Sequence, residues 1–211
     1  MKNSPGGNNT QSPRELLPAF YHQYQLCNDG GHSSSYVKIE FTKRIFLFFP
    51  NFDARRKAVF KHDVHHIATG YTSTFKGETE ISAWEIASGC RHYWVAWVLD
   101  LHAMMIGLLF NPIGVFKAFI KGRYTKNLYT DNFTDEQIID MPLNKIKEYM
   151  LLNVFDQSKK KPGFADILLF LLVLLLGAIY SLLSLVLLPF VLLYTLYVLM
   201  NSNKVKDQAA I

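Results

Sequence analysis

The chain of 211 residues is 50% hydrophobic and 14% aromatic, a composition that supports a packed core and excludes a wholly disordered chain. Its formal net charge is +5, and the basic residues fall in short clusters between apolar residues, which favours an anionic membrane surface over a nucleic acid as partner. The two cysteines, Cys27 and Cys90, form no CxxC pair, so we expect no disulfide framework and a reducing compartment.

The amino-terminal region predicts a tail and the beginning of a helical domain. Residues 1–13 are polar and rich in Gly, Pro and Asn, so we expect a flexible tail, and they lack the apolar segment of a signal peptide. A helical domain is expected over residues 14–155. Within it, "RELLPAFYHQYQLC" predicts a short helix that Pro18 starts or interrupts, and "NDGGHSSS" predicts a loop. "YVKIEFTKRIFLFFPN" predicts a short extended segment and then a continuous apolar stretch that ends at Pro50.

The next segment, "ARRKAVFKHDVHHIATG", has the pattern of a helix. Asp53 is the expected N-cap and Gly70 the expected stop. His62 and His66 are four residues apart, so they lie on the same face of this helix, and Asp63 lies on the neighbouring edge. An i, i+4 histidine pair is also common as an ordinary polar face.

A second helix is expected over "ETEISAWEIASG", with a turn at Gly77 and a stop at Gly89. Two consecutive helices joined by a loop of several residues form an antiparallel pair, which brings Glu78 back beside the end of the first helix. Glu80 points the other way on the second helix, and His65 flanks the histidine pair rather than completing it.

The sequence therefore predicts a metal site with four ligands: His62, Asp63, His66 and Glu78. Imidazoles and carboxylates suit zinc, and two histidines with a carboxylate also suit Fe(II). Glu85 lies seven residues after Glu78, on the same helical face, and is expected to orient one of the imidazoles.

An apolar, aromatic stretch runs from Tyr93 to Phe110 and is broken by Asp100 and His102. It predicts a buried or lipid-facing helix of the domain. Residues 113–126 predict either a helix at the membrane interface or an ordinary amphipathic helix on the core. Tryptophans of this region are expected to line a groove for a polyprenyl tail or to belong to the core: Trp84, Trp94 and Trp97.

The carboxy-terminal run from Ile167 to Met200 contains no charged residue and predicts a membrane segment. One interpretation is a single span that bends near Pro189. We favour the other, a hairpin that turns within residues 177–184, because basic residues on both sides favour two cytoplasmic ends. The expected boundaries of the basic linker, membrane segment and tail are 156–165, 166–200 and 201–211. The expected fold class is thus mainly α, with a helical metal-binding domain and a transmembrane or re-entrant segment.

The pattern His62-Asp63-x-x-His66, followed by Glu78 after eleven intervening residues, resembles the signature of the coenzyme Q (ubiquinone) biosynthesis protein 4 family. The resemblance is specific over about thirty residues and extends more weakly over residues 36–150. It implies a mainly helical, membrane-peripheral protein that binds zinc through these four residues. It also implies a role in replacing the C1 carboxyl of a prenylated quinone-head precursor by a hydroxyl, and partners in a biosynthetic complex. Typical members lack the carboxy-terminal apolar run.

Other functions remain open in the sequence. A non-catalytic scaffold that binds a lipid or quinone, with a structural ion, is the main alternative to a metal-dependent decarboxylase. "HDVHH" also approximates the H-E-x-x-H motif of zinc proteases, but its Asp is one methylene shorter than the catalytic Glu. A His-Asp phosphohydrolase needs further ligands in helices that the chain does not offer. The expected location is the cytoplasmic face of a bacterial inner membrane.

Overall fold

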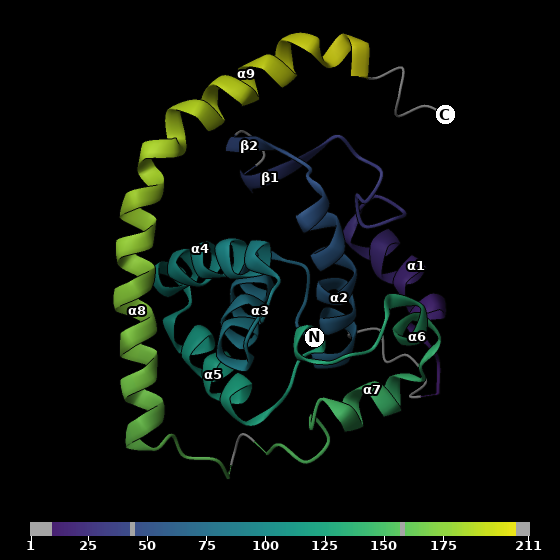
Figure 1. Ribbon diagram of the computed structural model, residues 1–211, viewed down its shortest axis with the longest axis vertical. Coiled ribbons are helices and arrows are strands. Elements are labelled where there is room, and N and C mark those ends of the chain that lie inside the picture. The colour runs from purple at the N-terminus through teal and green to yellow at the C-terminus, as the bar shows by residue number, and fades with distance from the viewer. Residues whose placement is uncertain (1–9, 43–44, 157–158, 206–211) are drawn as a thin grey trace.

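A computed structural model describes residues 10–42, 45–156 and 159–205 and confirms a mainly helical fold (Figure 1). Its centre is α3 (Phe75–Ser88), which packs against α4 (Trp94–Phe110) and α5 (Pro112–Tyr124). The approach of α3 and α5 requires a glycine, because a Cβ at Gly122 would lie 2.4 Å from the carbonyl oxygen of Trp84. Trp84 itself is fully buried. This three-helix core supports the face on which the candidate site lies.

Two elements precede the core, and both were only partly expected. Helix α1 (Pro13–Tyr24) begins at the end of the expected tail, of which residues 1–9 lie outside the described residues. The expected extended segment is strand β1 (Tyr36–Thr42), and the apolar stretch after it is a second strand, β2 (Ile45–Pro50). The two strands form an antiparallel hairpin in which Val37 pairs with Phe49.

Helix α2 (Asp53–Thr69) follows the hairpin and confirms the first predicted helix. Its N-cap is Phe52 rather than Asp53, so Asp53 is the first helical residue. Gly70 ends the helix in the left-handed region with φ 79°, as a glycine stop requires.

The prediction of a turn at Gly77 was wrong. Helix α3 already begins at Phe75, and the hydroxyl of its N-cap, Thr74, accepts a hydrogen bond from the backbone of Gly77. The glycine is needed for space rather than for a turn, because a Cβ there would lie 1.9 Å from the carbonyl oxygen of Thr72. The stop at Gly89 is confirmed.

Helix α5 packs on the core of the domain, whereas α4 also exposes large apolar residues such as Leu109 and Phe110. In α5, Val115, Phe119 and Ile120 are buried, which agrees with the core interpretation of this segment. The tryptophans do not share one environment: Trp84 is buried, whereas Trp94 and Trp97 are 55% and 39% exposed. Three short helices close the domain: η1 (Leu128–Thr130), α6 (Asp135–Asp140) and α7 (Leu143–Tyr149).

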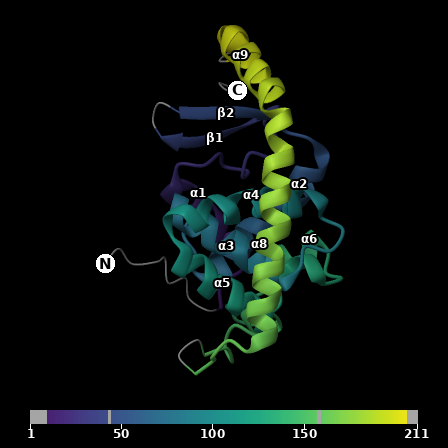
Figure 2. The same cartoon turned by 90° about the vertical axis from the view of Figure 1, so that its left-hand side faces the viewer.

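The carboxy-terminal run is one bent helix, so the favoured hairpin was wrong (Figures 1 and 2). Helix α8 (Phe164–Ser184) continues through the expected turn and passes by a 3-10 turn, η2 (Leu185–Leu187), into α9 (Leu188–Val205). The bend lies just before Pro189, which lacks an N–H for the helical ladder, as the alternative prediction required. Residues 164–201 are long and apolar enough to cross a membrane. In the linker, residues 157–158 are outside the described part, and so are residues 206–211 of the tail.

Candidate metal centre

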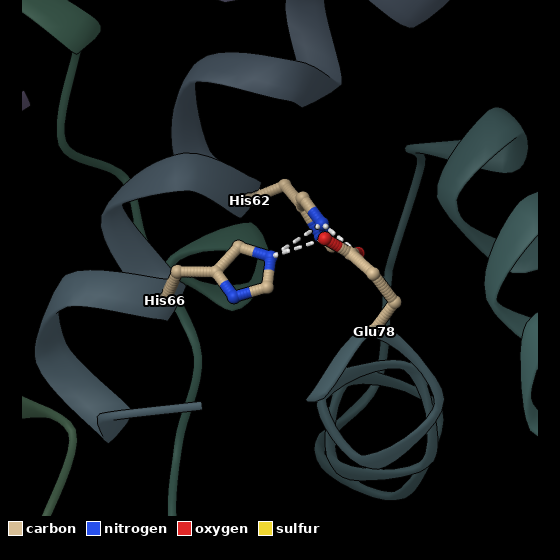
Figure 3. A group of neighbouring side chains, drawn as sticks. All are labelled: His62, His66 and Glu78. Atoms are coloured by element: carbon tan, nitrogen blue, oxygen red, sulfur yellow. Dashed lines mark hydrogen bonds and ion pairs between the residues drawn. The ribbon is translucent and has the colours of Figure 1, made fainter. Parts of the chain in front are cut away.

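The candidate site lies where α2 and the first turn of α3 face each other (Figure 3). His62 and His66 project from one face of α2, and Glu78 approaches from α3. The two Nε2 atoms lie 3.1 Å apart. Carboxylate oxygens of Glu78 lie 3.3 Å from Nε2 of His62 and 3.4 Å from Nε2 of His66. The structure therefore brings together three of the four predicted ligands.

These separations fit a single divalent ion. Zinc binds imidazole nitrogen and carboxylate oxygen at about 2.0–2.2 Å, so two donors of a tetrahedral site lie roughly 3.3 Å apart. The separation of the two Nε2 atoms, 3.1 Å, is close to that edge length, and each Nε2 has a different oxygen of Glu78 at a similar distance, 3.3 Å for Oε2 and 3.4 Å for Oε1. Fe(II) accepts the same set of two histidines and one carboxylate. The donor set fits either ion.

Both imidazoles are oriented by a second partner. Nδ1 of His66 donates to the carbonyl oxygen of Tyr71 at 2.9 Å, and a carbonyl can only accept, so this nitrogen carries a proton. Nδ1 of His62 lies 3.0 Å from the carboxylate of Glu85, so the glutamate that the sequence suggested as an orienting partner does contact one of the two imidazoles. When both rings are neutral, as metal binding requires, each Nε2 presents a lone pair to the cluster. Ligand histidines of metal sites commonly have this arrangement.

The charges of the cluster depend on one another. Burial alone would raise the pKa of Glu78, but hydrogen bonds from His62 and His66 and their charges lower it well below its usual range. Burial likewise opposes ionisation of Glu85, and His62 and His65 nevertheless lower its pKa. The pKa of His62 is raised well above its ordinary value, because these carboxylates outweigh its burial. The two ionised carboxylates therefore favour a positive charge at the cluster, either a proton on His62 or a cation in its place.

The structure places Asp63 apart from the three donors. One residue along a helix is a rotation of about 100°, so Asp63 faces α1 rather than α3. There its carboxylate accepts a hydrogen bond of 2.9 Å from the hydroxyl of Tyr21. Burial raises the pKa of Asp63 to about 6. Asp63 adjoins the site as a buried acid, but it does not belong to the group of mutually close donors.

Behind the cluster lies a buried polar network that includes residues the sequence did not assign. Nε2 of His65 accepts from the backbone N–H of Leu128 at 2.8 Å, so Nδ1 carries the proton and donates to Glu85. Donor atoms of Asp100, Glu85 and His62 lie within 4.8 Å of one another. Burial and the charge of Glu85 raise the pKa of Asp100 well above its usual range, which favours its protonated form beside the Glu85 carboxylate. The sequence does mark Asp100, as a single acid within an apolar stretch. Nothing in the sequence pattern indicates that Tyr21 contacts Asp63.

One side of the cluster is open to solvent. The side chain of Glu78 is 37% exposed and that of His62 is 21% exposed, whereas that of His66 is buried. On the Asp63 side there is a cavity of about 490 Å³ whose lining includes Tyr21, Phe60 and Asp63. Three protein donors with an open side leave room for water or substrate as a further ligand, the pattern of catalytic zinc sites.

The fold and site define a mainly helical protein with a candidate three-donor metal centre and one long apolar helix. Comparison with protein-family models, with curated proteins and with solved structures finds no match to this chain.

Proposed function

We propose that this protein is a membrane-associated metalloprotein whose site acts on, or presents, a prenylated quinone-head precursor. The observation that carries the proposal is the convergence of two imidazole Nε2 atoms and one carboxylate, with both Nδ1 atoms engaged elsewhere. The substrate class comes from the resemblance of the spacing His62-Asp63-x-x-His66-x(11)-Glu78 to the coenzyme Q biosynthesis protein 4 family. The proposed reaction is the replacement of the C1 carboxyl by a hydroxyl. The bond from C1 to the carboxyl carbon breaks with release of CO2, and dioxygen, together with two electrons and two protons from a reductant, supplies the hydroxyl oxygen and leaves its second oxygen atom as water.

The proposed ion is zinc, with Fe(II) as the alternative that the donors also accept. Zinc would act as a Lewis acid on a carboxylate or phenolate oxygen of the precursor. The chain's own residues hold the donors in place. Ser73 donates to Oε1 of Glu78 at 2.6 Å, and Glu85 and the Tyr71 carbonyl fix the two rings. Asp63, held by Tyr21, is a buried acid beside the donors, in position to exchange a proton through the adjoining cavity.

A second candidate role is a non-catalytic scaffold for a lipid or quinone, with a structural ion. Two of the donors belong to α2 and one belongs to α3. An ion bound by all three would therefore link the two helices, which favours this structural role. The open side of the cluster favours the catalytic role, because structural zinc sites are normally closed by four protein ligands.

The proposed location is the cytoplasmic face of a bacterial inner membrane, with partners in a biosynthetic complex and no nucleic acid. The apolar helix over residues 164–201 supports membrane association. The basic residues directly before it, Lys159 to Lys161, support a cytoplasmic position for that end.

The test begins with metal analysis of the purified protein, together with mass spectrometry of co-purifying isoprenoid lipid. Glu78→Gln is then compared with Glu80→Gln. The carboxylate of Glu80 accepts a hydrogen bond from Asn111 on another side of α3 and takes no part in the cluster. The catalytic role requires that Glu78→Gln abolish precursor turnover while the fold survives and Glu80→Gln stay active. If Glu78→Gln only lowers the melting temperature and turnover follows the folded fraction, the scaffold role stands. A purified protein without any bound metal, and unable to take up zinc, would overturn both.

A further inference from the structure

The outer surface of α8 is a continuous apolar stripe. Its exposed residues recur every three or four positions and so follow one side of the helix. They include Phe164, Leu168, Leu171, Leu172, Leu175, Leu176, Ile179, Leu182 and Leu183. Monomeric soluble proteins rarely expose so large an apolar surface, so the stripe requires a partner.

The opposite side of α8 is held against the folded domain along its whole length. In its first turn, Asp166 accepts a hydrogen bond from the Tyr124 hydroxyl and pairs with Arg123. In the middle, Phe170 packs on Phe116 and Phe119, with ring centroids 4.9 and 5.1 Å apart.

The contact between α8 and the folded domain continues to the last turn of α8. Gly177 lies so close to α4 that a Cβ there would be 2.7 Å from the sulfur of Met105. Ser184 lies 2.8 Å from Nε2 of His102. The domain therefore accompanies α8 from end to end.

Helix α9 is also attached to the domain, on the far side of the bend. The hydroxyl oxygen of Thr195 accepts a hydrogen bond of 3.0 Å from the backbone N–H of Phe48 in strand β2. The bent segment thus follows two sides of the domain, as Figures 1 and 2 show. Both halves of the segment have one side on protein and one side exposed.

A position of α8 perpendicular to the membrane plane conflicts with its packing on α4 and α5. If α8 crossed the bilayer, α5 and α4 would lie at the same depth, because they flank it along its length. Helix α5 carries Lys117, Lys121 and Arg123, and charges at that depth are costly and rare. Length and composition alone permit a span, but the contacts of α8 favour a position parallel to the membrane plane.

We propose that α8 lies in the plane of one leaflet, with the apolar stripe among the acyl chains and the domain on the headgroup side, while α9 turns away along a second side of the domain. The occupant of the stripe is an anionic lipid surface rather than a second copy of the chain. The argument is charge complementarity: the stripe begins next to exposed Lys159, Lys160 and Lys161, and Arg123 lies beside its first turn. The inference deepens the membrane association in the proposed function and rests on it.

The test is a depth profile in vesicles of phosphatidylcholine and phosphatidylglycerol. Single cysteines replace Leu168, Leu175 and Leu182 in a full-length Cys27→Ser background, since Cys90 is buried. Each carries a fluorophore, and brominated lipids report its depth by quenching. We expect the three positions to be quenched to the same extent at one shallow depth. A label at exposed Asn144 of α7 serves as the matched control and stays unquenched.

The two ends of the segment provide a second readout. Lys159→Cys and Asn201→Cys should both react with a membrane-impermeant maleimide added to the side where the domain lies. A depth that changes steeply from Leu168 to Leu182, with Asn201→Cys protected, would overturn the proposal in favour of a crossing. Absence of quenching at all three sites in a chain that sediments as a dimer would overturn it in favour of a second copy.

This experiment is independent of the metal centre. It uses neither zinc nor precursor, so a failure of the proposed chemistry leaves the depth profile unchanged. A crossing helix would in turn leave zinc binding and turnover unaffected. Omission of phosphatidylglycerol should weaken vesicle binding, because the basic residues beside the stripe then lose their partners.

Discussion

Glu85 lies behind His62, with its carboxylate 3.0 Å from Nδ1, while the other ring nitrogen faces Glu78. Glu85 is fully buried and also accepts from His65, so one carboxylate fixes two imidazoles of α2. The orientation of a proposed donor therefore depends on a residue outside the group of three donors. The stability of the core and the geometry of the site are coupled through this contact.

Glu85→Gln should weaken zinc binding without abolishing it. The amide oxygen still accepts one hydrogen bond, but the negative charge that orients His62 is lost. Loss of such an orienting partner typically costs about 10–100-fold in metal affinity. Competition with a chelator of known affinity measures this change. An affinity equal to that of the unchanged protein would contradict the orienting role.

His66→Gln should lower the zinc affinity by more than Glu85→Gln, roughly 100-fold or beyond, because it removes a donor rather than its support. The matched control is His92→Gln, since His92 is exposed and lies on the loop before α4. Metal content after dialysis, with circular dichroism to verify the fold, provides the measurement. Retention of stoichiometric zinc by the His66 variant would remove this residue from the site.

Chelation should lower the melting temperature, because an ion that binds only the folded chain stabilises it by mass action. The shift should disappear in Glu78→Gln and persist in Glu80→Gln. Calorimetry with and without chelator tests this expectation. A shift that persists in Glu78→Gln would place the stabilising ion elsewhere.

Gly122→Ala should destabilise the core by about 1–3 kcal/mol, the usual cost of overpacking. The new Cβ would meet the Trp84 carbonyl oxygen at 2.4 Å and the Ala87 Cβ at 2.7 Å, and neither atom can rotate away. The comparison is Gly70→Ala, where φ is 79° but no atom lies within 4 Å. That change costs only backbone strain, about 1 kcal/mol. Urea unfolding measures both, and a smaller loss at Gly122 would contradict the close packing of α3 and α5.

The stability of the domain should rise with pH from about 8 towards 10.5. Burial, with a smaller effect of the charge of Lys147, lowers the pKa of Lys121 to about 8 from its ordinary value of 10.5. The unfolded chain therefore binds more protons than the folded chain in that range, and stability rises as pH increases. Lys121→Met should remove this rise and Lys57→Met, at an exposed position, should keep it. Urea midpoints below and above pH 8 measure the effect, and an unchanged slope in Lys121→Met would exclude this lysine as its source.

Helical periodicity predicted the parts of the site that depend on one helix or on two consecutive helices. The spacing of His62 and His66 and the return of Glu78 follow from such local geometry. Asp63 differs because its direction depends on α1, which is distant in sequence, and a hydrogen bond from Tyr21 holds it there. The contribution of Asp100 likewise depends on the packing of α4 beside α3.

Two errors elsewhere come from close contacts that the sequence pattern does not show. Gly77 resembles a turn residue, but its lack of a side chain makes room for the carbonyl of Thr72. In the apolar run, basic flanks favoured a hairpin, yet contacts of Gly177 and Ser184 with α4 keep α8 continuous through the expected turn. The course of α8 was thus set by tertiary contacts, and the role of Gly77 by a close local contact with Thr72, and composition encodes neither.

The three donors come from a stretch that begins at His62 and ends at Glu78, only sixteen positions later. Such a short module keeps its geometry as long as two helix turns and the intervening loop are preserved. The geometry of the three donors is therefore independent of most of the rest of the sequence. Distant relatives of this protein are better sought by the spacing of these side chains than by overall likeness.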